Sequence, residues 1–163
     1  EPTLQPDLPE LATECKRRGF LVKVDTNGSR PEIVRTMLAT GTLDALAVDY
    51  KAPARRYAEV AACNCPDLLE RVRATLTLAA SSGLLLDVRT TVHREVLSRL
   101  DLRQMREELT ALGIGAWTLQ QFHPVPTLSP ELAGRPTYSD RELAEIAAEL
   151  DGGTRARGLR LNS

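Results

Sequence analysis

Short apolar runs alternate along this chain with longer segments in which apolar residues recur every three or four positions. The runs predict buried strands over residues 20–24, 45–48, 84–92 and 116–122. The longer segments predict amphipathic helices over residues 7–18, 29–40, 66–82, 100–112 and 139–150. Strands that alternate with helices at this spacing indicate βα units, so we expect an α/β fold with a parallel sheet and right-handed connections.

Capping signals and prolines refine the limits of these elements. A Ser or Asp that precedes a Glu by three positions predicts a capping box at the start of three helices: Asp7 with Glu10, Ser29 with Glu32, and Ser139 with Glu142. Four prolines in or beside residues 125–138 predict an extended loop there. We expect one domain over residues 1–150 and a loose tail over residues 151–163.

Polar residues stand at the carboxyl end of each predicted strand. The first strand runs into Asp25, Thr26 and Asn27, which are closed by Gly28. Ligands of parallel α/β folds bind at this edge of the sheet, where side chains from several strands converge. Period-two alternation then places the following sets on one face of their own strands: Lys23 with Asp25, Asp49 with Lys51, Arg89 with Thr91 and His93, and Gln121 with His123. We therefore expect Asp25, Asp49, Lys51 and His123 to line one shared site.

Composition narrows the classes of function. The chain has 163 residues, 26% of them charged, and a formal net charge of −1, which suggests neither disorder nor a nucleic-acid footprint. Apolar runs are too short for a membrane span and no signal peptide is visible, so we expect a cytoplasmic protein. Three cysteines argue against a disulfide framework. Cys15 is expected in the core, and Cys63-Asn64-Cys65 has no second pair of ligands with the spacing of a metal site.

Four segments together resemble, in order and spacing, the radical S-adenosylmethionine activating enzymes. They are Glu1-Pro2-Thr3-Leu4, Val24-Asp25-Thr26-Asn27-Gly28, Val48-Asp49-Tyr50-Lys51-Ala52-Pro53 and Leu119-Gln120-Gln121-Phe122. The chain looks most like the activating proteins of anaerobic ribonucleoside-triphosphate reductase, with the pyruvate formate-lyase activating enzyme as a cousin. The resemblance covers about residues 1–150 and implies a partial (β/α) barrel, of which the first two strands are expected to be missing here.

The resemblance also implies a cofactor site. In that family a Gly-Gly-Glu-Pro motif engages the methionyl amino group of S-adenosylmethionine, and Glu1-Pro2 corresponds to its second half. The implied contacts to the cofactor or to a monovalent cation beside its carboxylate come from Glu1, Asp25, Thr26, Asn27, Asp49, Lys51, Arg89 and His123. No residue is assigned a catalytic role, and none is assigned to a metal.

The family's chemistry requires a [4Fe–4S] cluster held by three cysteines in a C-x3-C-x2-C loop, which this sequence lacks. An electron from that cluster cleaves S-adenosylmethionine, and the resulting 5′-deoxyadenosyl radical abstracts hydrogen from a glycine of a partner enzyme such as anaerobic ribonucleotide reductase. We therefore expect this chain to be the carboxyl-terminal part of such an enzyme, and to be inactive alone.

Two other functions stay open at this point. One is a radical S-adenosylmethionine enzyme that acts on a small molecule, such as a deazapurine synthase. The other is a non-catalytic domain that binds a ligand or a partner. An open nucleotide-binding sheet is disfavoured, because no G-x-G-x-x-G or Walker loop follows any predicted strand.

Overall fold

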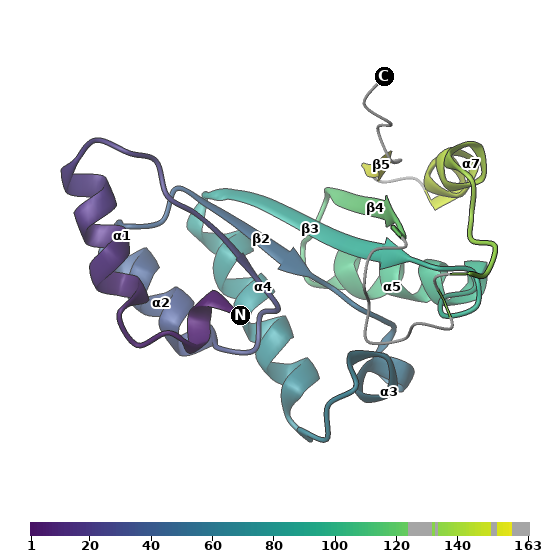
Figure 1. Cartoon of the computed structure of the whole chain (residues 1–163), viewed down its shortest axis with the longest axis horizontal. Helices are drawn as coiled ribbons and strands as arrows, with labels where there is room; N and C mark the ends of the chain where they lie inside the picture. The colour runs from purple at the N-terminus through teal and green to yellow at the C-terminus, as the bar shows by residue number, and fades with distance from the viewer. Residues whose placement is uncertain (124–131, 133, 151–152, 158–163) are drawn as a thin grey trace.

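A computed structural model of the chain describes residues 1–123, 132, 134–150 and 153–157. The elements are a 3-10 turn η1 (Pro2–Leu4), α1 (Leu8–Arg17), β1 (Lys23–Thr26), α2 (Pro31–Ala39), β2 (Ala45–Asp49), a second 3-10 turn η2 (Ala54–Arg56), α3 (Tyr57–Ala61), α4 (Leu68–Ser82), β3 (Leu85–Val92), α5 (Arg99–Ala111), β4 (Trp117–Gln121), α7 (Asp140–Leu150) and β5 (Thr154–Arg157) (Figure 1). The predicted α/β fold, with helices between parallel strands, is confirmed.

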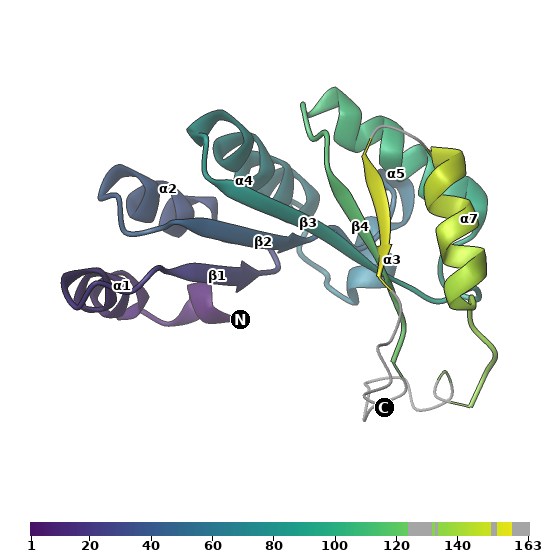
Figure 2. The same ribbon diagram turned by 90° about the horizontal axis from the view of Figure 1, so that it is seen from above.

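The five strands are all parallel and lie in the sheet in chain order, β1-β2-β3-β4-β5. Because each right-handed crossover moves the chain by one strand in the same direction, the helices gather on one side of the sheet. Figure 2 shows α2, α4, α5 and α7 along the convex side of the curved sheet, which leaves its concave side open. This is the winding of a (β/α) barrel rather than that of a doubly wound sheet, in which the order reverses.

The core lies between the convex face of the sheet and the helices. Alternation along the strands turns Val24, Leu46, Val48 and Val88 toward the helices, and each is at most 5% exposed. The helices contribute large buried side chains to the same cluster, including Met37, Leu76, Leu102, Met105, Leu109, Leu143 and Ile146. Burial of these apolar groups fixes the register of the strands, since a slip by one residue would turn them toward the concave face.

The first strand begins later than the sequence pattern suggests. Residues 20–24 were expected as a buried strand, whereas β1 spans Lys23–Thr26. Gly19, at φ +83°, ends α1, and the backbone N–H of Phe20 still bonds to the carbonyl of Cys15. Phe20 and Leu21 are consequently 61% and 83% exposed. Cys15 is only partly buried, so the prediction that it lies in the core is wrong.

Two of the three predicted capping boxes are wrong. Asp7 makes no capping hydrogen bond, and α2 begins at Pro31 after Arg30, so that Ser29 does not cap it. Ser139 and Glu142 do form the expected reciprocal bonds. A further box was missed, between Ser98 and Asp101 at the start of α5. Its acidic member is Asp, whose shorter side chain is less typical at that position than Glu or Gln.

The expected loose tail is wrong for Thr154–Arg157, which form β5 beside β4. This strand has only four residues, two of them arginine, so no apolar run marks it. The predicted loop over residues 125–138 falls mostly outside the described residues, as do residues 151–152 and 158–163 of the predicted tail.

Candidate functional site

Arg89 bridges two strands at the carboxyl-terminal half of the sheet. Its Nη1 donates to Oδ2 of Asp25 on β1 at 2.9 Å, and its Nη2 donates to Oδ1 of Asp49 on β2 at 3.0 Å. The register pairs Asp49 directly with Arg89, while Ala47 stands opposite Asp25. The small side chain of Ala47 allows the guanidinium to cross β2 and reach β1. We call Asp25, Asp49 and Arg89 the Arg89 bridge.

The carboxylates of the Arg89 bridge are more exposed than its guanidinium group. The Arg89 side chain is 14% exposed, whereas those of Asp25 and Asp49 are 52% and 49% exposed. Burial opposes the charge of Asp25, but the hydrogen bond and charge of Arg89 outweigh it and hold the pKa of Asp25 below its usual value. Lys23 lies 3.4 Å from the other oxygen of Asp25. The two carboxylates therefore share one guanidinium, and about half of each carboxylate side chain stays exposed to solvent.

A second set of polar groups joins Glu1 to the end of β1. One Glu1 oxygen accepts from Oγ1 of Thr26 at 2.7 Å, and the other accepts from the backbone N–H of Asn27 at 2.7 Å. Thr3 donates its hydroxyl and its N–H to the same carboxylate. Burial alone would raise the pKa of Glu1, but these hydrogen bonds lower it on balance. Glu1 therefore holds the tip of β1 as an ionised acceptor.

Gly28 completes the turn that presents this tip. Its φ is +77°, a region that glycine adopts without steric cost. A Cβ at this position would stand 3.2 Å from Cγ1 of Val48, so the backbone here packs closely against the core. Thr75 on α4 donates its hydroxyl to the Gly28 carbonyl at 2.8 Å. The Asp25–Asn27 tip therefore rests on a tightly packed turn.

Lys51 lies between two cavities at the same edge of the sheet. One cavity, of about 210 Å³, is lined by Asp49, Tyr50, Lys51, Val60, Arg89, Thr90 and Thr91. The other, of about 160 Å³, is lined by Asn27, Ser29, Lys51, Tyr57, Ala61, Cys63, Cys65 and Leu68. Lys16 and Lys23 pair with acids, but within the described residues no ion pair is formed by Lys51. Lys51 is thus a candidate cation for a ligand in either cavity.

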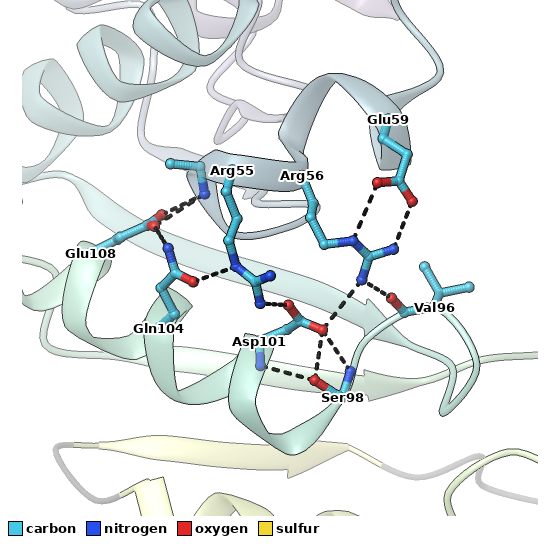
Figure 3. Close-up of polar contacts among 9 residues, drawn as sticks. Arg55, Arg56, Glu59, Val96, Ser98, Asp101, Gln104 and Glu108 are labelled. Carbon is cyan, nitrogen blue, oxygen red and sulfur yellow. Dashed lines mark hydrogen bonds and ion pairs between the residues drawn. The ribbon is translucent and has the colours of Figure 1, made fainter.

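Contacts to α5 fix the segment that carries Lys51. Glu108 accepts from the hydroxyl of Tyr50 at 2.5 Å and from the backbone N–H of Ala54 at 3.0 Å, on either side of Lys51. Figure 3 shows the neighbouring contacts, in which Arg55 and Arg56 both reach Asp101. Burial and the adjacent Glu108 raise the pKa of Tyr50, so its hydroxyl stays a donor. The β2–α3 segment is therefore held on both sides of the lysine.

The fourth strand does not join the site as period-two alternation predicted. Gln121 pairs with Val92 and donates to the carbonyl of Tyr138, which puts it on the helix side of the sheet. Gln120, which pairs with Thr91, stands on the concave side instead. The error arose because alternation fixes which residues share a face, but not which face is concave. His123 is exposed, and its predicted part in the site stays a prediction.

The concave face is polar beyond the predicted residues. Register places five further polar side chains on it: Asp87, Thr118, Gln120, Arg155 and Arg157. Thr118 donates to Asp87 across the strands at 3.3 Å. The arginines of β5 were missed because no apolar run marked that strand. A polar face of a parallel sheet is unusual for a buried layer and typical of one that lines a solvent-filled opening.

Metal ligands do not gather in the described part of the chain. No group of three His, Cys, Asp or Glu side chains there is placed to hold a metal ion. Cys15 lies on α1, while Cys63 and Cys65 lie between α3 and α4. In the same residues, no helix is both long enough and apolar enough to cross a membrane.

Comparison with known proteins shows similarity to an archaeal sequence. The chain is 28% identical over 149 residues to a Methanocaldococcus jannaschii protein named "Putative glycyl-radical enzyme activating enzyme". The match covers 90% of this chain and 61% of that protein, so the chain spans about three fifths of its relative. No family model matches the sequence.

Solved structures share the fold. A domain of the pyruvate-formate lyase-activating enzyme from Bacteroides vulgatus superposes with a TM-score of 0.73 at 19% identity, covering 98% of this chain and 94% of that domain. TYW1 with a lysine-pyruvate adduct bound gives 0.72 at 20% identity, covering 94% of this chain and 48% of that one. Streptococcus suis SuiB bound to the precursor peptide SuiA gives 0.73 at 10% identity, covering 99% and 37%. This similarity confirms the predicted barrel-type α/β fold.

Proposed function

We propose that this chain forms part of the S-adenosylmethionine pocket of a radical enzyme that activates a glycyl-radical enzyme. The observation that carries the proposal is the Arg89 bridge, with Lys51 beside it, at the carboxyl ends of β1, β2 and β3. The name of the Methanocaldococcus jannaschii relative and the fold of the pyruvate-formate lyase-activating enzyme domain support the same class.

The residues present suit the amino-acid end of S-adenosylmethionine. Asp25 and Asp49 offer half-exposed carboxylate oxygens that are able to accept from an ammonium group or border a cation. Lys51 offers a donor for a carboxylate, and a charge-assisted bond of this kind is stronger than a neutral one. Glu1 orders Thr26 and Asn27 beside them. When bound, S-adenosylmethionine supplies the 5′-deoxyadenosyl group, while these side chains hold and orient it.

The iron–sulfur cluster has no assigned ligands in the described residues, because Cys15 is distant from Cys63 and Cys65 and no third ligand joins that pair. The role we propose for this chain is accordingly to hold the cofactor and not to reduce it. We further propose that a longer protein with this chain acts on a glycyl-radical enzyme such as anaerobic ribonucleoside-triphosphate reductase.

Calorimetric titration of the folded chain with S-adenosylmethionine tests the pocket. We expect weak binding, and we expect Lys51→Met to weaken it by about tenfold or more, since a hydrogen bond to a charged group contributes about 1.5–3 kcal/mol. Asp25→Asn should also weaken binding, whereas the control Asp140→Asn, on the exposed start of α7, should not. A folded chain without affinity for S-adenosylmethionine would contradict the proposal and favour a non-catalytic domain.

The partner is tested with the longer protein under reducing conditions. We expect a glycyl radical, detected by electron paramagnetic resonance, when a glycyl-radical enzyme is present with S-adenosylmethionine. Cleavage of S-adenosylmethionine that depends instead on a small molecule, with no protein radical, would overturn the partner assignment and favour the small-molecule enzyme.

A further inference from the structure

The proposed function leaves Cys63 and Cys65 without a role, although both line a cavity beside the proposed pocket. Both side chains line the 160 Å³ cavity together with Lys51, Tyr57 and Asn27. Cys65 is exposed and Cys63 is partly buried, and both are free thiols. An oxidant in solution is therefore able to reach the pair through Cys65.

The backbone holds the two cysteines in fixed positions. The N–H of Cys63 bonds to the carbonyl of Ala58 at 3.3 Å, which anchors it to the end of α3. The carbonyl of Cys65 accepts from the N–H of Leu68 at 3.1 Å, which anchors it to the start of α4. The connection between α3 and α4 therefore keeps the backbones of Cys63 and Cys65 close together.

The two side chains line the same cavity. The neighbouring Cys63 side chain, more than burial, raises the pKa of the Cys65 thiol. Residues two apart in sequence have Cα atoms within about 7 Å of each other, which is the limit beyond which a disulfide requires backbone movement. The spacing of the two residues therefore permits a bond between their sulfur atoms through side-chain rotation.

We propose that Cys63 and Cys65 form a reversible disulfide that reshapes the cavity beside Lys51. With a low-molecular-weight disulfide as oxidant, one cysteine thiolate attacks a sulfur of the oxidant and releases one thiol. The second cysteine then attacks the protein sulfur of that mixed disulfide and releases the other thiol. Two electrons and two protons pass from the protein to the oxidant. The two protein thiols become a disulfide, and the disulfide of the oxidant becomes two thiols.

Reversibility follows from the exposure and short spacing of the pair. A disulfide that closes so short a loop removes little entropy from the unfolded chain, so folding stabilises it weakly. Exposed disulfides are also the readily reduced ones. Formation of the bond brings the two sulfur atoms to about 2 Å from each other, which changes the wall of the cavity that both cysteines line with Lys51. Lys51 also lines the neighbouring cavity, which contains Asp49 and Arg89.

Glutathione redox buffers and mass spectrometry test the proposal on the folded chain. We expect the peptide that contains Cys63 and Cys65 to lose two hydrogen atoms as oxidised glutathione rises, and to regain them with dithiothreitol. Cys63→Ser and Cys65→Ser should each lose this product and accumulate glutathione on the remaining cysteine. The control Cys15→Ser should retain it, because α1 and α3 lie at opposite parts of the molecule in both views (Figures 1 and 2).

A second readout follows the cavity without use of any cofactor. The chain has three lysines, so labelling by an amine-reactive acetylating reagent resolves Lys51 from Lys16 and Lys23. We expect oxidation to change the labelling rate of Lys51 alone, and Cys65→Ser to abolish that change. Glutathione adducts in place of an internal disulfide, or a disulfide that forms only in urea, would overturn the proposal. A disulfide with unchanged Lys51 labelling would overturn the effect on the cavity.

Discussion

Arg89 and Asp101 are each held between two opposite charges, yet their surroundings differ. Arg89 serves two carboxylates that are about half exposed. Asp101 accepts from two guanidinium groups, but its side chain is only 5% exposed. The first arrangement leaves acceptor oxygens facing solvent at the edge of the sheet where ligands bind in such folds.

The Asp101 group is satisfied by the protein itself. Its oxygens accept from Arg55 at 2.5 Å, from Arg56 at 3.3 Å, and from the N–H and hydroxyl of Ser98 at 3.0 and 2.7 Å (Figure 3). Both oxygens bond to the protein and the side chain is buried, so little of this group is accessible to a ligand and it joins α5 to η2. A candidate site is therefore distinguished from a structural cluster by its unused hydrogen-bonding capacity, rather than by its charge.

The largest expected effect is on the structural group. Asp101→Ala removes the capping box of α5 and leaves Arg55 and Arg56 without their shared acceptor. We expect a loss of about 2–4 kcal/mol in the free energy of unfolding, since loss of an N-cap box and of a buried ion-pair partner each contribute. Urea unfolding monitored by circular dichroism measures it.

The matched control for this substitution is Glu145→Ala on α7. Glu145 pairs with Arg141 at 2.9 Å on an exposed face, and such pairs contribute at most about 1 kcal/mol. If the two alanine variants were equally stable, Asp101 would not be the structural anchor that its burial indicates.

A smaller loss of stability, with a marked change in titration, is expected from Arg89→Gln. The variant leaves Asp25 and Asp49 without the guanidinium between them, although Lys23 stays near Asp25 at 3.4 Å. Because both carboxylates are half exposed, solvent screens the loss to about 1 kcal/mol. The pKa of Asp25 should rise toward its usual value, as measured by carboxyl NMR titration. Arg141→Gln should leave that pKa unchanged.

How much of this could be predicted from sequence depends on what fixes each element. The helices and central strands followed from periodicity, because burial imposes a period of 3.6 or 2 on their apolar residues. The polar residues at the ends of β1 and β2, Asp25 and Asp49, could be predicted for the same reason, since each ends an apolar run. In contrast, β5 is set by pairing with β4 and not by its own composition.

The contacts within the site depended on register, which alternation alone does not supply. The sequence places Arg89 on one face of its strand. Only the register, which pairs Asp49 with Arg89, shows that the guanidinium reaches β2 and, beyond it, β1. For the same reason, alternation predicted that Gln121, and not Gln120, faces the site. The Asp101 group was missed because its partners are 45 or more residues apart in sequence.

The smallest expected effect distinguishes the two groups by pH. Burial alone would raise the pKa of Asp25 and of Asp101, but hydrogen bonds and arginine charges lower both below the usual 3.8. A lowered pKa in the folded state gives stability that is complete above the unfolded value and is lost as the pH falls through the folded value. We therefore expect unfolding free energy to fall as the pH drops below about 4.

Asp101→Asn should clearly reduce this loss of stability at low pH. Asp25→Asn should reduce it only slightly, by about 0.5 kcal/mol or less, because solvent screens the exposed carboxylate. Equal flattening by the two variants, in urea unfolding at matched pH values, would mean that Asp25 is as fully engaged by the protein as Asp101 and has no capacity left for a ligand.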